Sequence, residues 1–141
     1  MRNDLDVIER VIDIAASPET VFTLLTDSAA YVRWKGRLAE LDPRAGGRFH
    51  VDFKDSAVSG AYLEVVPNRR VVFTWGWDAP GAAVPPGGST VEIDLEPRAG
   101  GTRLHLVHRG LPSAELAGHT EGWDYFLPRL IAVAEGKEPA A

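Results

Sequence analysis

Histidine side chains are the groups in this sequence best suited to acid–base chemistry. His108 alternates with Leu104 and Leu106 in a run typical of a β-strand, so its side chain is predicted to point into the interior. An inward histidine is either hydrogen-bonded within the core or a polar anchor for a bound molecule. A general base is a third reading, but no acid or nucleophile pairs with it in an obvious way. We therefore assign no catalytic residue, and a non-enzyme is the favoured class.

Metal and phosphate chemistry are not supported by the spacing of the polar residues. His105 and His108 lie three positions apart on a predicted strand, which places them on opposite faces. His50 and Asp52 share a polar face, but two ligands do not complete a metal site. The paired glycines are typical of turns rather than of phosphate-binding loops. The sequence predicts no metal and no cofactor.

A ladder of aromatic residues is the strongest candidate for a binding surface. Phe73, Trp75 and Trp77 share one face of a predicted strand. Such rings are either plain core packing or the walls of a pocket for an apolar ligand. Phe73 and Trp123 are expected in the core, whereas Trp75 and Trp77 are better pocket candidates. The predicted ligand-binding residues are Trp34, Phe49, Phe53, Phe73, Trp75, Trp77, His108, Trp123, Phe126 and Leu127.

The clearest element that could position these side chains is a C-terminal helix. Apolar residues recur there at spacings of three and four, which is one face of a helix. Pro128 lies inside this run and predicts a kink or local break near Tyr125. Gly136 is a suitable stop. The periodic positions are Leu116, Thr120, Trp123, Leu127, Leu130 and Ala134.

Most of the chain before this helix predicts strands. Residues 5–15 form a first strand with its isoleucines inward, and Ser17 then caps a short helix. A second helical turn is expected at 31–35. Later segments alternate between apolar and polar residues and are separated by turns, which predicts an antiparallel meander. The loop 78–88 holds three prolines and three glycines and is either a mobile connection or a flap over a cavity mouth.

Composition narrows the classes of partner. The chain has 141 residues, 45% of them hydrophobic, and we expect one domain over 1–141 with a core of about 7–136. A net charge of −5 argues against nucleic acid or an anionic membrane as partner. Without cysteine there are no disulfides. No run is long and apolar enough to span a membrane, and the first residues lack a signal-peptide core, so a cytoplasmic location is expected.

Several short motifs follow one another in a specific order and spacing. They are Ser17-Pro-Glu-Thr-Val-Phe with Trp34; Gly47-Arg-Phe; Gly60-Ala-Tyr-Leu-Glu-Val-Val-Pro67 before Arg70-Val-Val-Phe-Thr-Trp75; Ser89-Thr-Val-Glu-Ile; Gly101-Thr-Arg-Leu with His108-Arg-Gly110; and Gly122-Trp123 with Leu127 and Leu130. As a set they resemble the START-like superfamily (SRPBCC, the birch-pollen-allergen fold). Within it, the chain is similar to bacterial proteins related to the C-terminal domain of the heat-shock-protein-90 ATPase activator.

This resemblance implies an α+β helix-grip fold. A curved antiparallel sheet would wrap around the long C-terminal helix, with two short helices after the first strand and a cavity between sheet and helix. Members bind lipids, hormones or polyketides, a minority are cyclases or hydrolases, and the activator branch is linked to the stress response. One departure is that Lys35 and Arg37 replace an aromatic residue and a proline after Trp34. A basic entrance of this kind favours a ligand with an acidic group.

The leading hypothesis is non-catalytic binding of a small, largely apolar molecule between the sheet and the C-terminal helix. His108 and Arg37 would orient its polar end. The alternative is a chaperone-interacting module, and a further alternative is a cyclase- or hydrolase-like enzyme. The expected partner is a small apolar or amphipathic molecule, with a chaperone as the alternative and no nucleic acid or membrane. The sequence leaves the ligand and the oligomeric state open.

Overall fold

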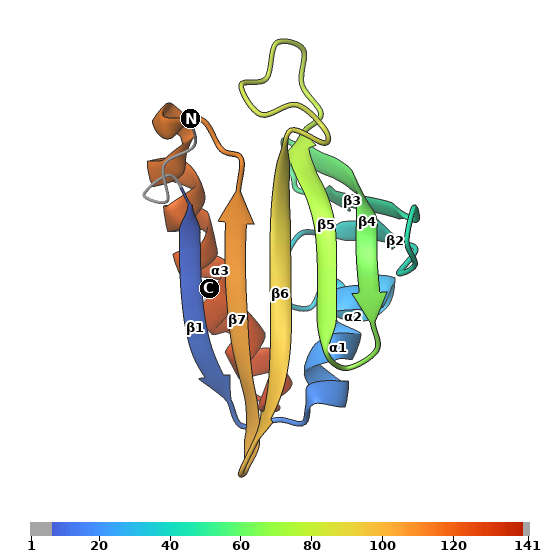
Figure 1. The fold of residues 1–141 in the computed structure, drawn as a ribbon, viewed down its shortest axis with the longest axis vertical. Helices are drawn as coiled ribbons and strands as arrows, with labels where there is room; N and C mark the ends of the chain where they lie inside the picture. The colour runs from blue at the N-terminus through green and yellow to red at the C-terminus, as the bar shows by residue number, and fades with distance from the viewer. Residues whose placement is uncertain (1–6, 140–141) are drawn as a thin grey trace.

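The protein is an antiparallel sheet with one long helix against it (Figure 1). The computed structural model describes residues 7–139. Its seven strands are arranged in the order β1-β7-β6-β5-β4-β3-β2. This confirms the predicted α+β helix-grip fold. In chain order the elements are β1 (Ile8–Ile14), α1 (Pro18–Thr26), α2 (Ser28–Tyr31), β2 (Leu38–Leu41), β3 (Arg48–Asp52), β4 (Ala57–Val66), β5 (Arg70–Trp77), β6 (Ser89–Arg98), β7 (Gly101–Arg109), η2 (Ser113–Glu115) and α3 (Leu116–Ala134).

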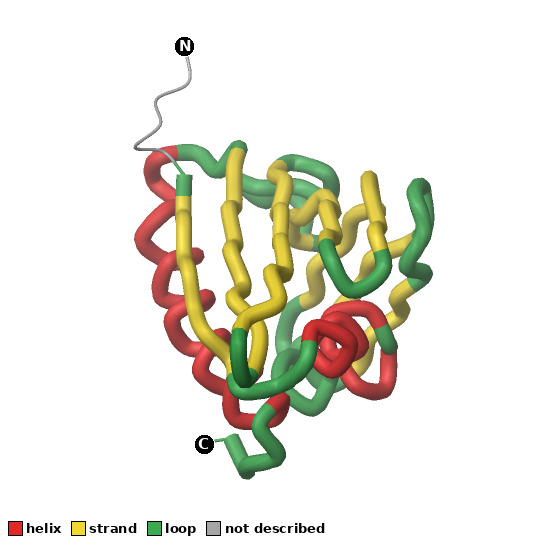
Figure 2. The backbone as a smooth tube through the Cα atoms, turned by 60° about the horizontal axis from the view of Figure 1, so that its bottom comes forward, coloured by secondary structure: helices red, strands yellow, loops and turns green. Residues whose placement is uncertain are grey.

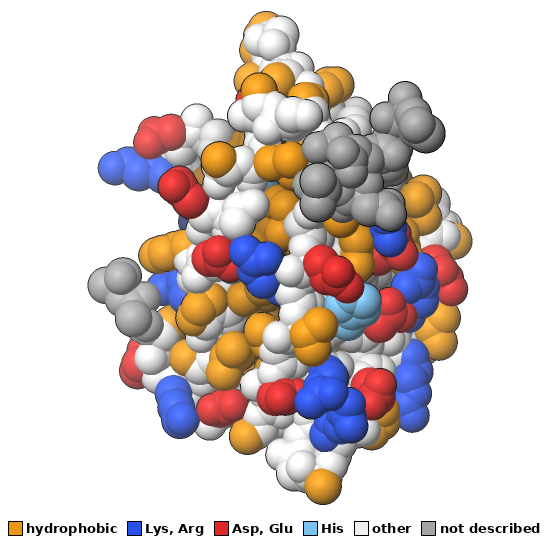
Figure 3. Space-filling model, turned by 60° about the vertical axis from the view of Figure 1, so that its left-hand side comes forward, with side chains coloured by type: hydrophobic (Ala, Val, Ile, Leu, Met, Phe, Trp, Pro, Cys, Tyr) orange, Lys and Arg blue, Asp and Glu red, His pale blue; other side chains and the backbone are white. Residues whose placement is uncertain are grey.

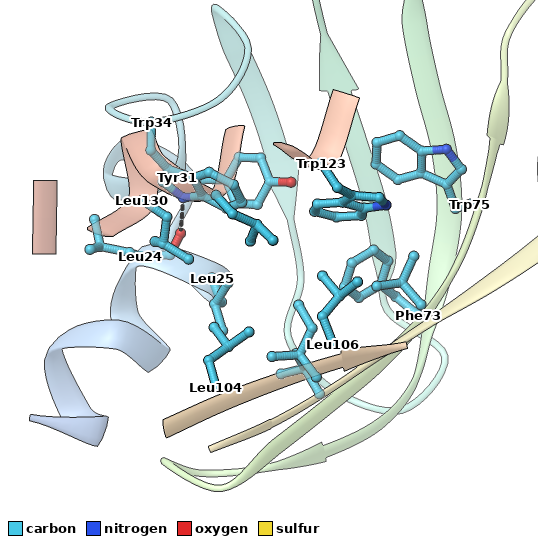
Figure 4. Packing of buried hydrophobic residues seen from close by; sticks show 14 of the residues in the cluster. Leu24, Leu25, Tyr31, Trp34, Phe73, Trp75, Leu104, Leu106, Trp123 and Leu130 are labelled. Atoms are coloured by element: carbon cyan, nitrogen blue, oxygen red, sulfur yellow. Dashed lines mark hydrogen bonds between the residues drawn. The ribbon is translucent and has the colours of Figure 1, made fainter. Parts of the chain in front are cut away.

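The sheet curves, and the helices lie on its inner side (Figure 2). Helix α3 runs behind β1 and β7 in Figure 1, while α1 and α2 close the lower end of the sheet. Figure 4 shows the core between them, where Leu104 and Leu106 of β7 lie opposite Leu130 of α3 and Leu25 of α1. Burial of these side chains is the main force that holds the helices to the sheet.

Short-range signals set the first elements. The Ser17 hydroxyl accepts a hydrogen bond from the Thr20 N–H, which caps α1 as predicted. The second helix spans Ser28–Tyr31 and not the expected 31–35. The reason is that the Asp27 carboxylate caps it by accepting from the Ala30 N–H, at 2.9 Å.

Strand β1 presents its isoleucines to the core, as the alternation predicted. Ile8 and Ile14 are buried, whereas Val11 on the other face is 56% exposed. The strand begins at Ile8, and Leu5 and Asp6 of the predicted segment lie outside the described residues.

Helix α3 is continuous from Leu116 to Ala134, so of the two predicted outcomes at Pro128 the local break does not occur. Pro128 removes a hydrogen bond to the carbonyl of Asp124, but both residues are exposed, so water can satisfy that carbonyl. The predicted stop is confirmed. Gly136 has a φ of 78°, and its N–H donates to the Val133 carbonyl while the Lys137 N–H donates to the Ala132 carbonyl.

The loop of residues 78–88 extends beyond the ends of β5 and β6 (Figure 1). Its base is packed, because Val84 is buried and its carbonyl accepts a 2.7 Å hydrogen bond from the Trp77 N–H. The turn passes so close to β5 that a Cβ on Gly76 would lie 1.7 Å from the Pro85 carbonyl oxygen. Only glycine fits at this point of the strand.

The surface around β1 carries charges of both signs. On the part of this face that Figure 3 draws in colour, acidic and basic side chains alternate among small apolar patches. Within residues 7–139, no helix is long and apolar enough to cross a membrane.

Candidate functional site

A groove of about 510 Å³ lies between the sheet and the first half of α3. One wall comes from β5 and from the segment after β3, and the other from α3. Lys35, from the connection between α2 and β2, lines it as well. The remaining lining residues are Phe53, Ser56, Trp75, Trp77, Glu115, Gly118, His119, Gly122, Trp123 and Phe126.

The structure divides the predicted ligand-binding residues into two sets. Half of them line the groove, namely Phe53, Trp75, Trp77, Trp123 and Phe126. The other half are Trp34, Phe49, Phe73, His108 and Leu127, which are buried in the core and do not line the groove. Arg37 is exposed and lies outside the lining, as does the loop 78–88, so neither the expected cationic anchor nor a flap is found at this site.

The aromatic side chains of the groove form a continuous row of ring contacts. The centroid of Phe53 lies 5.9 Å from that of Phe126 and 6.0 Å from that of Trp77. Trp75 lies 6.1 Å from Trp77 and 6.0 Å from Trp123. Figure 4 shows the ring of Trp123 extending from α3 toward that of Trp75 on β5. The row therefore joins the two walls and gives the groove an apolar lining.

Lys35 is the residue of this site that the predicted list missed. Only 4% of its surface is exposed, and its ammonium lies 3.9 Å from the ring centroid of Trp123 and 4.3 Å from that of Trp75. Phe126 and Trp34 are 5.2 and 5.7 Å away. Among the described residues the ammonium has no hydrogen bond and no carboxylate partner. It is a buried cation held by ring faces alone.

Neighbouring residues explain how a lysine enters this interior position. The Trp34 indole N–H donates to the Leu24 carbonyl, and the Trp34 carbonyl accepts from Arg129 of α3. Gly36 follows with a φ of 79°, and a Cβ there would lie 2.5 Å from the Val51 side chain. Glycine thus permits the tight reversal after Lys35 that directs its side chain inward.

Burial lowers the pKa of Lys35 to about 7 from the usual value of 10.5. Desolvation disfavours the charged form of an amine, and no nearby carboxylate offsets this effect. Near neutral pH a substantial share of the Lys35 side chains is therefore uncharged, which is unusual for lysine.

His108 lies behind the groove and orients one of its walls. Its Nδ1 accepts a 3.0 Å hydrogen bond from the Trp123 indole N–H. Its Nε2 is 2.8 Å from the Ser89 hydroxyl, which itself donates to the Trp75 carbonyl. Burial, helped by the charges of His119 and Lys35, lowers the pKa of His108 to about 3 and keeps it neutral. Of the readings open from the sequence, the hydrogen-bonded core histidine is the one that this geometry matches.

His119 lies on the groove itself and has both ring nitrogens occupied. Nδ1 is 2.8 Å from the Glu115 carbonyl oxygen, and Nε2 accepts from the Trp77 indole N–H at 3.1 Å. This pattern assigns the proton to Nδ1. The histidine therefore holds Trp77 in place and links η2 and α3 to the β5 wall.

Two helical glycines keep the groove open on the α3 side. Gly118 and Gly122 both line it, and a Cβ at either position would meet no atom within 4 Å. Glycine inside a helix costs about 1 kcal/mol relative to alanine. The two glycines therefore destabilise the helix although a larger residue would fit at either position. Their missing side chains leave free space beside the aromatic row.

Other clusters of polar side chains have structural roles in the fold. His50 contacts the Ser59 hydroxyl at 2.7 Å and Asp52 at 3.2 Å, and Ser59 donates to Asp78 at 2.6 Å, which ties the base of the long loop to the sheet. In residues 7–139 no group of three or more metal-ligating side chains is placed to hold an ion. A larger hollow of about 870 Å³ lies on the outer sheet face, where cations such as Arg70 face carboxylates.

Part of this site had a signal in the sequence. His119, Gly122 and Phe126 recur at helical spacing and so share one face of α3, and Glu115 lies in the preceding η2 turn, four residues before His119. Lys35 was visible only as a departure from the family pattern. No local signal announces that a lysine will be buried, since lysine is almost always exposed.

Comparison with known proteins places this geometry in a family. The human activator of 90 kDa heat shock protein ATPase homolog 1 is 27% identical over 111 residues, which is 78% of this chain and 31% of the human protein. The chain thus spans less than a third of that curated relative.

Solved structures and a family model agree with this relationship. An AHSA1-like protein from Rhizobium etli is 43% identical, with a TM-score of 0.73 over 96% of this chain and 85% of its own. A protein from Chromobacterium violaceum is 29% identical, with a TM-score of 0.78 over 93% and 98% of the two chains. The model named "Activator of Hsp90 ATPase homolog 1-like protein" matches residues 15–135. The predicted resemblance is confirmed: the chain belongs to this family, within the SRPBCC helix-grip superfamily.

Proposed function

We propose that the protein binds a small amphipathic molecule with an apolar body and one acidic group. The observation that carries this proposal is the Lys35 ammonium, which is buried among aromatic rings on the groove wall without a carboxylate partner in the described residues. An acidic ligand would supply the missing counter-charge. The proposal keeps the apolar ligand expected from the sequence and moves its polar anchor from His108 to Lys35.

The aromatic row supplies the binding energy for the apolar body. A flat ring between Trp75, Trp77 and Phe126 would be removed from water on both faces. At about 25 cal/mol per Å², burial of roughly 200 Å² of apolar surface contributes about 5 kcal/mol before the entropy cost of association. Burial of the apolar body alone therefore gives a dissociation constant no lower than about 0.2 mM.

Lys35 supplies the preference for an acid. A carboxylate beside the ammonium favours its charged form, so the pKa of Lys35 is expected to rise from about 7 when an anion binds. At pH 8, where the free amine is mostly neutral, binding of the anion therefore takes up a proton. Affinity for an acid is expected to fall as the pH rises above 7.

The test compares 2-naphthoate with its neutral analogue 2-naphthalenemethanol. Binding is followed by quenching of tryptophan fluorescence, since Trp75, Trp77 and Trp123 line the groove. At pH 6.5 the acid is expected to bind about tenfold more tightly than the alcohol, as one charge-assisted hydrogen bond contributes roughly 1.5 kcal/mol. Lys35→Met should remove this preference and leave binding of the alcohol intact.

Two leucine substitutions on α3 serve as matched controls. Gly122→Leu places a side chain in the groove and should abolish binding of both compounds. Ala117→Leu adds the same group on the exposed side of the helix, away from the lining, and should leave binding unchanged. Equal affinities in the wild type and the Gly122→Leu protein would refute a ligand site in this groove.

Interaction with a chaperone is the second candidate, and the family match supports it. The named activity belongs to relatives such as the human protein, of which the match covers only 31%, so its transfer to this chain is a proposal. The test is the ATPase rate of a purified heat-shock-protein-90 chaperone with and without the protein. Stimulation supports the candidate, and an unchanged rate at saturating protein removes it.

A cyclase- or hydrolase-like activity gains less support from the site. His108 is hydrogen-bonded to Ser89 and Trp123, and no carboxylate in the described part of the chain is hydrogen-bonded to it. Ser89 is itself buried and donates to a backbone carbonyl. We therefore build no catalytic step on this pair.

A further inference from the structure

The Lys35 amine differs in its surroundings from the other two lysines of the chain. Lys54 and Lys137 are exposed, and Lys137 pairs with Glu135 at 3.2 Å. Lys35 lines the groove, and its nitrogen contacts ring faces rather than carboxylates. An amine in apolar surroundings is not locked in an ion pair and can act as a nucleophile.

We propose that Lys35 also reacts covalently, forming a reversible imine with apolar aldehydes or ketones that enter the groove. This inference rests on the proposed function, because the same aromatic row must first bind the body of the carbonyl compound. It adds a chemical reaction to that site and a second class of ligand, one that carries a carbonyl in place of an acid.

The reaction needs only the two partners and one proton from the solvent. The lone pair of the neutral amine forms a bond to the carbonyl carbon, and the C=O π electrons move to the oxygen. A proton passes from nitrogen to that oxygen through water in the open groove. A proton from the solvent joins the hydroxyl group of the carbinolamine, which leaves as water while the nitrogen lone pair forms the C=N bond. The products are one protonated imine and one water molecule, and hydrolysis reverses the sequence.

The surrounding rings favour each stage of this reaction. They bind the apolar aldehyde and place its carbonyl near the nitrogen, which replaces an encounter in solution by a local one. The protonated imine carries its positive charge where the ammonium stood, 3.9 and 4.3 Å from the ring centroids of Trp123 and Trp75. The ring faces that hold the ammonium therefore also stabilise the product cation.

The protonation state of the amine supports the same inference. The pKa of Lys35 is lowered to about 7, so near pH 7 roughly half of the side chains are in the reactive neutral form. A lysine with an ordinary pKa is neutral in only about one molecule in a few thousand at this pH. Lower basicity also reduces the intrinsic nucleophilicity of the amine. The expected gain in rate is therefore smaller than the ratio of the two neutral fractions.

The experiment traps the imine with sodium cyanoborohydride in the presence of 2-naphthaldehyde at pH 7. Peptide mass mapping then measures modification at each lysine. Lys35 is expected to react at least about tenfold faster than Lys54 or Lys137, given its neutral fraction. Lys35→Met should remove the fast modification of the protein. Lys54→Met, which changes an exposed lysine outside the groove, should leave this fast modification in place.

A parallel titration with 2-naphthalenemethanol separates this inference from the proposed function. If the alcohol binds while the aldehyde modifies all three lysines at similar rates, imine formation is refuted and the binding groove stands. If neither compound binds, both ideas fail. Added 2-naphthoate provides a further check, because it should pair with the ammonium and slow the trapping at Lys35. Trapping that is insensitive to naphthoate would place the reaction outside the groove and would also refute the inference.

Discussion

Two cations on opposite sides of the sheet illustrate two ways of holding a positive charge. Arg70 on the outer face contacts Glu64 at 3.0 Å, Asp94 at 2.8 Å and Glu92 at 3.2 Å. The hydrogen bonds that Arg70 donates to Glu64 and to the other two carboxylates raise its pKa. Lys35 on the inner face has ring faces instead, and burial lowers its pKa to about 7. One charge is stabilised by the fold, and the other is disfavoured by it.

This difference separates a structural charge from a candidate functional one. The Arg70 cluster joins β4, β5 and β6 and is partly open to water, so its contribution is modest but favourable. Lys35 forms no such link and stays partly neutral near physiological pH. A group kept in an unfavourable state beside an open groove is a good candidate for ligand contact.

The largest expected effect is a gain in stability when the Lys35 charge is removed. Lys35→Met replaces a poorly solvated amine by an apolar side chain of similar length, and should raise the free energy of unfolding by about 3 kcal/mol at pH 6. Chemical denaturation measures this change. A loss of stability in the variant would show that the ring contacts stabilise the charge more than burial disfavours it.

The wild-type protein should also become more stable as the pH rises above 7. The pKa of Lys35 is about 7 in the folded protein, against 10.5 for a lysine in the unfolded chain. Between these two pH values the unfolded chain binds more protons, so the free energy of unfolding rises with pH. The gain is about 2 kcal/mol between pH 7 and about pH 9. Above pH 10 the raised pKa values of Tyr31 and Tyr62 act in the opposite direction.

The Lys35→Met protein is the control for this pH series. It retains the other titratable groups of the site, which are His108 on β7, His119 on α3 and Glu115 in η2. The difference between the two stability curves therefore isolates Lys35. Parallel curves for the wild type and the variant would contradict a lowered pKa.

Removing the outer cation, Arg70, should lower the free energy of unfolding, whereas removing Lys35 should raise it. Arg70→Met leaves three carboxylates close together and is expected to lower the free energy of unfolding by about 1 kcal/mol, the scale of a partly exposed ion-pair network. Arg44→Met breaks an exposed pair with Asp42 and should have little effect. If Arg70→Met were stabilising, as Lys35→Met is expected to be, the contrast between the two faces would not hold.

The smallest expected effect concerns the helix glycines. Gly118→Ala should raise the free energy of unfolding by about 1 kcal/mol, because alanine favours the helix and its Cβ meets no atom within 4 Å. The same methyl narrows the groove and should weaken binding of 2-naphthalenemethanol a few-fold. Thermal unfolding and fluorescence titration measure the two changes separately. A more stable protein with unchanged binding would mean that the ligand does not reach this end of the groove.

Local patterns in the sequence predicted most of the fold. The isoleucine alternation of β1, the Ser17 cap and the Gly136 stop depend on neighbouring residues only, and each is confirmed. The second helix was misplaced, and the local break allowed for at Pro128 does not occur. The second helix begins where the Asp27 carboxylate caps it. Helix α3 continues through Pro128 because the carbonyl that loses its partner lies on the exposed side of α3.

The sequence by itself determined the strand and helix periodicity, the family and the presence of many aromatic rings, because these follow from spacing along the chain. Tertiary structure decided which rings line a groove and which fill the core. It also decided that Lys35 is buried, since this depends on Trp75 and Trp123, which lie 40 and 88 positions further along the chain. Desolvation arises from residues brought together in space, and no local pattern encodes it.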